Sequence, residues 1–490
     1  MQPFTKENKR QLIACEVVTV LILLGLIFWS VRPLLEEWKV LNAFNSQGIT
    51  FLFDNGLSIA MRPLHLSAYA LQWLLGYGHT FGVTATVALM MLLRYIVVRW
   101  AVTPFIQGQT RWMLATLAAV LIGWSGAWLG RFTPATLSAF FFFAVLGFSI
   151  RLAQKWSYVW ACGCIISVSF ILLSYQGLAL CLLVIPLMPL FWTDGAEKLN
   201  TKTFHAVVRI FCPIALTLII YSIYSIIISR SQPEGYEATL AGDSARLLTF
   251  NGFIDHISTG FSTAYGQELL LLPILLFIAL FIHWYHTYDN NHENNIIIDQ
   301  IKIVLLVILL PCLSIIYISA LHIRDTDRVL YPLSIGFVLV CVLIAIKHKS
   351  SDIFNHKLTN APFVIIIVLL TSSTISAYHI KKYASIQSDI LRQTIAAIDE
   401  HAATSVIIRD MTGTIGDVYT FLPPILTDAL ATYGKKIDAT ICTPISVDRL
   451  HPVAQRYPIP STERCEEMAN KPNGALILTA QFINNSLIIK

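Results

Sequence analysis

Two adjacent carboxylates, Glu36 and Glu37, directly follow the first long apolar stretch, in the segment Arg-Pro-Leu-Leu-Glu-Glu-Trp at 32–38. Ionisable groups at a membrane boundary are costly to place and are often functional. One carboxylate of such a pair can act as a general base that takes a proton from an attacking hydroxyl. The alternative without a functional role is a solvated loop with ordinary surface acids, and the spacing alone leaves both interpretations open.

Arginines stand at two further boundaries. Arg62 lies in Met-Arg-Pro-Leu, at the entrance to a short apolar helix, and Arg324 and Arg328 flank Asp325 and Asp327 in a tight segment between two apolar stretches. A guanidinium matches phosphate oxygens in bidentate geometry, so both segments are candidate phosphate clamps. The alternative for Arg62 is a snorkelling interfacial side chain whose charged end extends into water. The alternative for 324–328 is a loop whose charges pair with one another.

Three other polar residues are candidates for binding a sugar or an acceptor. Asp54 lies in the same segment as Arg62, where a turn-forming role is the alternative. Tyr175 and Gln176 interrupt a long apolar stretch and would line a cavity or form a turn.

The composition requires these residues to be positioned by membrane helices. Only 13% of the 490 residues are charged and 56% are hydrophobic, with a mean hydropathy of +0.65. A soluble domain carries about a quarter charged residues, so a soluble enzyme, a disordered protein and a small disulfide-rich domain are excluded. A scattered net charge of +5 does not indicate nucleic-acid binding. Stretches of about 20 apolar residues predict eleven spans: 12–31, 82–101, 112–130, 134–150, 157–174, 177–193, 209–229, 268–285, 302–320, 329–346 and 362–379.

The placement of Lys and Arg predicts the orientation. Lys6, Lys9 and Arg10 put the N-terminus in the cytoplasm, and Arg94, Arg99 and Arg111 are assigned to the next inside segments. With eleven spans the C-terminus lies outside, and the long outer segments are 32–81, 230–267 and 380–490. The apolar run 64–75 is too short to span, which favours an interfacial or re-entrant helix.

The C-terminal tail at 380–490 differs in its sequence pattern from the apolar spans before it. Buried strands are expected at 405–408, 439–442 and 474–479, with a helix at 421–433 that ends at Gly434. The sequence thus predicts a transmembrane domain over 1–379 and a small extracytoplasmic α/β domain over 380–490. Cys442 and Cys465 are the tail's two cysteines, and outside the cytoplasm they are expected to form a disulfide, the alternative being two separate buried thiols. No cysteine or histidine spacing indicates a metal site.

Taken together, the pattern resembles the GT-C class of membrane glycosyltransferases, and most of all the Gtr-type serotype-converting glucosyltransferases that modify bacterial O-antigen. The resemblance rests on Glu-Glu-Trp at 36–38, Arg-Pro-Leu at 62–64, Tyr-Gln at 175–176 and the Arg-bearing loop at 324–328, and by architecture it covers about 10–380. Glu-Glu stands where such proteins more commonly have Asp-Asp, which leaves open which acid is the base.

The resemblance implies an inverting transfer of a sugar, with glucose as the expected sugar, from undecaprenyl phosphate to lipid-linked O-antigen on the periplasmic side of a bacterial inner membrane. It implies that Glu36 or Glu37 is the base and that Arg62, Arg324 and Arg328 bind the donor phosphate. It also implies a functional link to a donor synthase and a flippase. No cofactor is implied, and a metal is not obligatory because the leaving group is a lipid monophosphate.

Two other functions are alternatives to glycosyl transfer. An O-antigen polymerase or ligase would more naturally place its chemistry in large outer loops late in the chain, whereas here the acids follow the first span. A polysaccharide or lipid transporter should carry charges near mid-membrane, often within internal repeats, and no repeat is visible. The sequence therefore favours the glycosyltransferase.

Overall fold

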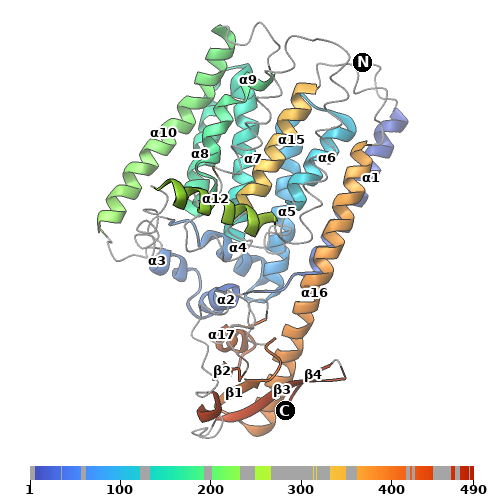
Figure 1. Ribbon diagram of the computed structural model, residues 1–490, viewed down its shortest axis with the longest axis vertical. Helices are drawn as coiled ribbons and strands as arrows, with labels where there is room; N and C mark the ends of the chain where they lie inside the picture. The colour runs from blue at the N-terminus through green and yellow to red at the C-terminus, as the bar shows by residue number, and fades with distance from the viewer. Residues whose placement is uncertain are drawn as a thin grey trace. The chain divides into compact units, whose positions relative to one another are not determined.

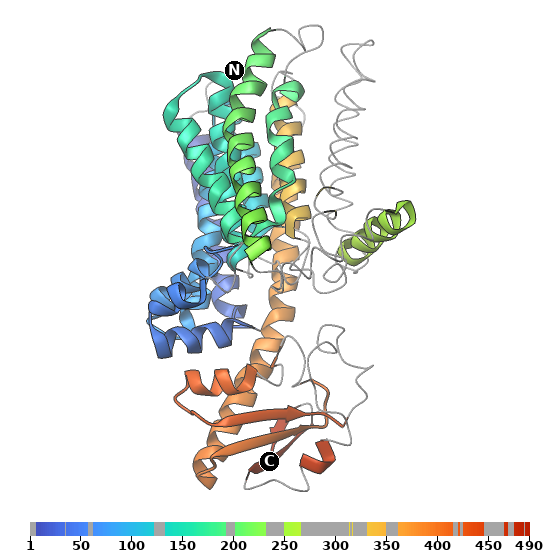
Figure 2. The same ribbon diagram turned by 90° about the vertical axis from the view of Figure 1, so that its left-hand side faces the viewer.

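The structure is a computed structural model (Figures 1 and 2), and it describes residues 6–34, 36–56, 62–121, 133–192, 201–231, 249–265, 313, 316, 331–348, 361–414, 420–421, 425–444, 465–468, 475–484 and 486–490. The chain divides into two compact units. The helical unit comprises Met1–Gly25, Gly56–Ala68 and Val87–Thr374, and the mixed unit comprises Leu26–Asn55, Tyr69–Thr86 and Ile375–Lys490. The predicted boundary at 379/380 stays a prediction.

Most described elements are helices. The first part of the chain forms α1 (Lys6–Ser30), α2 (Glu36–Gln47), α3 (Thr50–Gly56), α4 (Ser67–Gly76), α5 (Phe81–Val102), α6 (Gly108–Val120), α7 (Thr133–Gln154) and α8 (Tyr158–Ser174). The later helices are α10 (Thr201–Ser231), α12 (Phe250–Tyr265), α15 (Tyr331–His348) and the long α16 (Ala361–His401), which Figure 1 labels.

Five described helices are long and apolar enough to cross a membrane: Arg10–Ser30, Phe81–Val102, Thr133–Gln154, Thr201–Ile228 and Pro362–His401. Two shorter apolar helices, Tyr158–Ser174 and Ser334–Ile346, coincide with two more of the predicted spans. Large aliphatic side chains of α10, such as Ile219, Ile223 and Ile227, are more than half exposed, as expected of a helix that faces lipid. The chain is therefore a multi-pass membrane protein.

Other predicted spans are only partly described. The span at 112–130 begins as α6, and residues 122–130 lie outside the described part of the chain. The span at 268–285 also lies outside it, as does 302–320 apart from residues 313 and 316. The count of eleven stays a prediction.

The predicted span at 177–193 is not one continuous α-helix, and its crossing of the membrane stays a prediction. The segment forms the short turns η3 (Gln176–Leu178) and η4 (Cys181–Leu187), followed by α9 (Pro189–Trp192). Pro186 lies inside η4 and Pro189 begins α9. Because proline has no N–H and clashes with the preceding turn, two prolines this close prevent one continuous α-helix despite the apolar composition.

The assignment of Arg94 to an inside loop is wrong. Arg94 lies within α5 and is fully buried. Its guanidinium donates to the carbonyl oxygens of Ala118 at 3.1 Å and Ala119 at 2.7 Å, in the last turn of α6. The last carbonyls of a helix have no partner within it, so a buried arginine can satisfy them. The positive-inside rule assigns such an arginine to a cytoplasmic loop, whereas these contacts give Arg94 a structural role.

The mixed unit contains a four-stranded sheet, shown in Figure 2 beside the C-terminal part of α16. Its strands are β1 (Ser405–Asp410), β2 (Asp438–Cys442), β3 (Leu476–Ile483) and β4 (Ser486–Ile489), in the order β2-β1-β3-β4. β1 is parallel to β2 and β3, and β4 is antiparallel to β3. The helix α17 (Ile425–Thr432) connects β1 to β2 and is followed by Gly434, whose positive φ of 80° suits a helix end.

Both edges of the sheet are covered by polar side chains of helices. On β2, the Thr427 hydroxyl of α17 is 3.0 Å from both the amide nitrogen and the carbonyl oxygen of Ala439. On β4, the Gln393 side chain of α16 donates to the carbonyl oxygen of Leu487 at 2.9 Å and accepts from the amide of Ile489 at 2.8 Å. Unpaired strand edges invite association with other chains, and each of these contacts occupies part of one edge.

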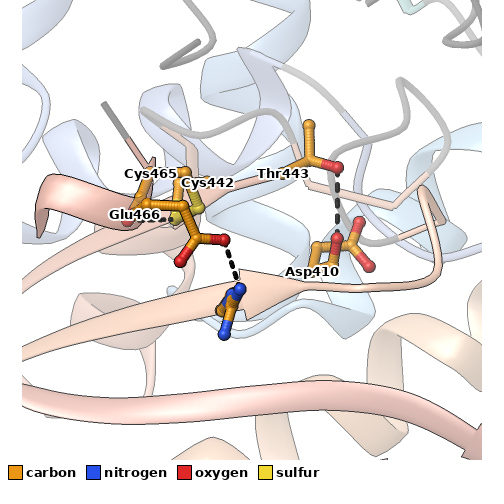
Figure 3. The surroundings of a disulfide bond; sticks show 6 residues. Asp410, Cys442, Thr443, Cys465 and Glu466 are labelled. Atoms are coloured by element: carbon orange, nitrogen blue, oxygen red, sulfur yellow. Dashed lines mark hydrogen bonds and ion pairs between the residues drawn. A yellow bond between two sulfur atoms is a disulfide. The ribbon is translucent and has the colours of Figure 1, made fainter. Parts of the chain in front are cut away.

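The two tail cysteines, Cys442 and Cys465, form a disulfide across a sequence separation of 23, and both are fully buried. Figure 3 shows the bond at the end of β2. Glu466, which follows Cys465, forms an ion pair with Arg409 of β1. Nearby, the Thr443 hydroxyl donates to the carbonyl oxygen of Asp410 at 3.1 Å, which ties the ends of β2 and β1 together.

Removing the disulfide should destabilise the mixed unit. For a closed loop of this length we expect the Cys442→Ser, Cys465→Ser double variant to lose about 3 kcal/mol of stability against unfolding. The measurement is thermal unfolding in detergent with and without a reductant. Replacing the exposed thiols Cys162 and Cys212 by serine is the matched control and should cause no comparable shift. Equal unfolding temperatures for the two double variants would contradict this expectation.

Candidate functional site

The paired carboxylates lie in the first turn of α2, where the helix dipole favours negative charge. Glu37 is 6% exposed, and both of its carboxylate oxygens accept hydrogen bonds. Oε2 accepts from the backbone amide of Leu34 at 2.8 Å, and Oε1 accepts from the side-chain amide of Gln72 at 3.2 Å. The bond to Leu34 is the reverse arm of a capping box, which fixes the entrance to the helix. Glu37 therefore has a structural role in this site.

Glu36 differs from its neighbour in burial. It is half-buried, in the same helical turn. The type and order of the two residues do not distinguish them, but their burial does. Glu36 is the carboxylate of the pair whose side chain has exposed surface.

Gln72, the partner of Glu37, comes from α4, the short apolar helix. The structure starts this helix at Ser67, three residues later than the predicted run at 64–75, because residues 63–66 form a turn. Leu74, Tyr77 and Phe81 are each more than half exposed around the end of α4, which is typical of an interfacial element.

The end of α4 and the start of α5 touch through their backbones. A Cβ added to Gly82 would lie 1.9 Å from the carbonyl oxygen of Gln72 and 2.8 Å from the amide nitrogen of Gly76. Between them, Gly78 has a φ of +81°. Only glycine permits this close approach, which places Gln72 beside Glu37.

Gly82→Ala should therefore destabilise the mixed unit. Because the atoms in the way are backbone and cannot rotate aside, we expect a loss at the upper end of the about 1–3 kcal/mol seen for overpacking. Thermal unfolding in detergent measures it. Gly25→Ala is the control, because an added Cβ there has nothing within 4 Å. If both variants unfold at the same temperature, the close packing at Gly82 is not important for stability.

A second group of polar side chains lies in the helical unit, and it joins two of the motifs found in the sequence. The guanidinium carbon of Arg62 lies 5.8 Å from the ring centroid of Tyr175. The His65 ring stacks on the same Tyr175 ring at 6.2 Å, and its Nδ1 is 3.1 Å from the carbonyl oxygen of Ser174. The amide of Leu64 also donates to the carbonyl oxygen of Leu173 at 3.0 Å. Arg62 and Tyr175, predicted separately, therefore lie side by side.

Gln176 extends this group. Its side-chain amide donates to the Tyr221 hydroxyl of α10. We call Arg62, His65, Tyr175, Gln176 and Tyr221 the Arg62 cluster. All five are half-buried, so the cluster combines partial exposure with cationic and hydrogen-bonding groups.

Sequence reasoning missed His65, Tyr221 and Gln72. His65 directly follows the Arg-Pro-Leu motif, and this adjacency was a usable signal. Gln72 is a polar residue near the middle of an otherwise apolar helix, which also could have been noticed. Tyr221 sits within a long apolar helix and carried no local signal.

The remaining candidates are not placed. Arg324, Asp325, Asp327 and Arg328 lie outside the described residues, as does the side chain of Asp54, whose backbone belongs to α3. Among the described residues, no group of three or more His, Cys, Asp or Glu side chains is arranged to hold a metal ion.

Comparison with known proteins adds evidence from solved structures alone. No protein-family model matches the sequence, and no curated protein matches it. Among solved structures, the chain is similar to ArnT from Cupriavidus metallidurans, crystallised bound to undecaprenyl phosphate. The TM-score is 0.48 at 12% sequence identity, over 96% of this chain and 93% of that one. A likeness of this size assigns no role to any residue, so any functional proposal rests on the contacts among the described residues.

Proposed function

We propose that this chain is a membrane glycosyltransferase that moves a sugar from a polyprenyl-phosphate donor to a hydroxyl group of a lipid-linked acceptor. The observation that carries the proposal is the Arg62 cluster, in which a cation, an imidazole, a phenol and an amide from separate segments meet next to membrane helices. Such a group suits the phosphate and sugar of a lipid-linked donor better than it suits a structural anchor, which would need only the arginine.

Arg62 is suited to bind a phosphate. Its guanidinium carbon lies 5.8 Å from the Tyr175 ring centroid, within the range of a cation–π contact, so the ring holds the cation in this cluster. A guanidinium carries a planar set of N–H donors that matches two phosphate oxygens. Gln176 and His65 are assigned to the sugar or the acceptor, together with Tyr175.

Glu36 is the base in this proposal. It takes the proton from the acceptor hydroxyl as the hydroxyl oxygen bonds to the anomeric carbon of the donor sugar. The bond from that carbon to the phosphate oxygen breaks, and its electron pair leaves with the lipid monophosphate. Attack opposite the leaving group inverts the anomeric centre. Arg62 stabilises the negative charge that develops on the departing phosphate.

The finer assignment follows the sequence resemblance to Gtr-type enzymes. It makes glucose the sugar, undecaprenyl phosphate the carrier and lipid-linked O-antigen the acceptor. It places the reaction on the periplasmic side of the inner membrane, with the N-terminus in the cytoplasm and with a donor synthase and a flippase supplying the substrate. In that resemblance Arg324 and Arg328 assist Arg62. By their residue types and positions, Asp54, Asp325 and Asp327 are assigned to contacts with the sugar or the acceptor.

A transfer assay tests the proposal. Purified protein in detergent or liposomes receives short-chain polyprenyl-phosphate glucose labelled in the sugar, with lipid-linked O-antigen as acceptor. We expect labelled acceptor together with release of polyprenyl phosphate, and no product when UDP-glucose replaces the lipid donor.

Other results would point to the rival functions. Lengthening of the acceptor by whole repeat units without any glucose donor would indicate a polymerase. Movement of labelled lipid between the leaflets of liposomes without covalent transfer would indicate a transporter. Either result would overturn the glycosyltransferase assignment.

A further inference from the structure

The helix that carries Glu36 is built into the core of the C-terminal α/β domain. Trp38 of α2 is 1% exposed, and its ring lies 5.8 Å from that of Phe421 and 6.3 Å from that of Tyr433. It shares one hydrophobic core with Ile390 and Leu391 of α16. A buried tryptophan contributes several kcal/mol of packing energy, so α2 is an integral part of this core.

Polar contacts fix the position of α2 on that core. The side-chain amide of Asn42 donates to the carboxylate of Asp428 on α17 at 2.9 Å. A hydrogen bond is directional, so this contact sets the position of α2 along α17 where the apolar contacts would allow it to slide.

Gln387 of α16 holds the segment that leads into α2. Its side chain is almost fully buried, and its amide nitrogen donates to the carbonyl oxygens of Pro33 and Thr420, each at 3.0 Å. Pro33 lies three residues before Glu36 and 354 positions before Gln387. Leaving these buried carbonyl groups without their donor would be costly, so Gln387 connects the first turn of α2 to the C-terminal residues.

From these contacts we infer that the C-terminal α/β domain positions the proposed base, and that Gln387 is the positioning residue. The inference rests on the proposed function for the role of Glu36, and on Trp38, Asn42 and Gln387 for the way the helix is held. Displacing a catalytic group by about 1 Å can cost about 10²-fold in rate, so loss of this support should be visible in catalysis. Residues 380–490 thereby gain a function in the reaction although none of them is a proposed reacting group.

Gln387→Met tests the inference against a matched control on the same helix. Gln393 also uses its side-chain amide to bond a backbone carbonyl, that of Leu487, but on the far strand β4. We expect Gln387→Met to lower kcat by about 10²-fold with the donor KM unchanged. Gln393→Met should destabilise the domain to a similar degree. It should leave kcat within about two-fold of the parent, because the hydrogen bonds of Gln393 go to β4 and not to the segment that leads into α2.

A second readout does not depend on activity. In the Glu36→Cys background, the rate of maleimide labelling at position 36, read by mass spectrometry of that peptide, reports how firmly the first turn of α2 is held. We expect Gln387→Met to raise this rate several-fold and Gln393→Met to leave it unchanged. Equal labelling rates in the two variants, or equal losses of kcat, would overturn the inference. Absence of sugar transfer by the unmodified protein would instead overturn the proposed function, while the labelling result still decides whether Gln387 holds the helix.

An exchange of partners covers the case in which Gln387→Met does not fold. Asn42→Asp places two carboxylates side by side at Asp428 and should lower kcat, whereas adding Asp428→Asn restores the hydrogen bond with donor and acceptor exchanged. Recovery of kcat in the double variant supports positioning through this contact. A double variant as slow as Asn42→Asp alone would count against it.

Discussion

Glu36→Gln should abolish sugar transfer while the protein stays folded. A glutamine has nearly the same shape but cannot accept the proton of the acceptor hydroxyl, so we expect kcat to fall by about 10²–10⁴-fold, the range for loss of a general base. Because Glu36 is half-buried at the helix start, the amide can be accommodated there. The measurement is the transfer assay under donor and acceptor saturation, with thermal unfolding followed in parallel.

Two variants control this result. Glu400→Gln makes the same chemical change at an exposed position of α16 and should leave kcat unchanged. Glu37→Gln keeps one carbonyl acceptor where two are used, so it should lower the unfolding temperature, at a cost of about 1–3 kcal/mol for an unsatisfied buried group. A Glu36→Gln protein with the parent's kcat would remove Glu36 from the role of base.

Arg62→Ala should give the second large effect, on the donor side. Without the guanidinium, the charge that develops on the leaving phosphate loses its cationic partner, and removal of one such group typically costs about 10²–10³-fold in kcat. Arg62→Lys should recover only part of the rate, because an ammonium cannot make a bidentate contact with a phosphate. Initial rates across a range of donor concentrations measure both variants.

The matched control for Arg62 is Arg392→Ala. Arg392 is exposed on α16 and pairs with Asp389 at 2.9 Å, three residues away on the same helix. Exposed pairs of this kind contribute little to stability, so this variant should behave like the parent protein. Tyr175→Leu adds a further comparison, because it removes the ring beside Arg62 while leaving the charge, and its loss of rate should be smaller than that of Arg62→Ala. Normal donor turnover in Arg62→Ala would exclude Arg62 from phosphate binding.

The sequence was informative about elements whose signal is local. Hydropathy over about 20 residues located seven spans that the structure describes as apolar helices. Short apolar runs in the tail located β1, α17, β2 and β3. The strand β4 was missed because it is four residues long and returns through Asn484, whose φ of 52° closes the turn. A pair of asparagines between two apolar runs was the available signal.

Local composition misled where a backbone constraint or a distant partner decided the outcome. Residues 177–193 are apolar enough to span, but Pro186 and Pro189 prevent a continuous helix. Arg94 carries the charge expected of an inside loop, yet carbonyl oxygens of α6 make its burial within α5 possible. Hydropathy summed over a window reflects neither the proline constraint nor the hydrogen-bond acceptors that another helix supplies.

By itself, the sequence determined that this is a membrane protein with a small mixed domain in its tail, and it identified Glu36, Glu37, Arg62 and Tyr175 as residues to examine. Only the tertiary structure decided their relations. It gave Glu37 a buried partner 35 residues away, joined His65 to Ser174 across 109 residues, and held the start of α2 through Gln387 across 354 residues. The physical reason is that hydropathy and periodicity describe neighbours along the chain, whereas hydrogen-bond partners and burial depend on which distant segments pack together.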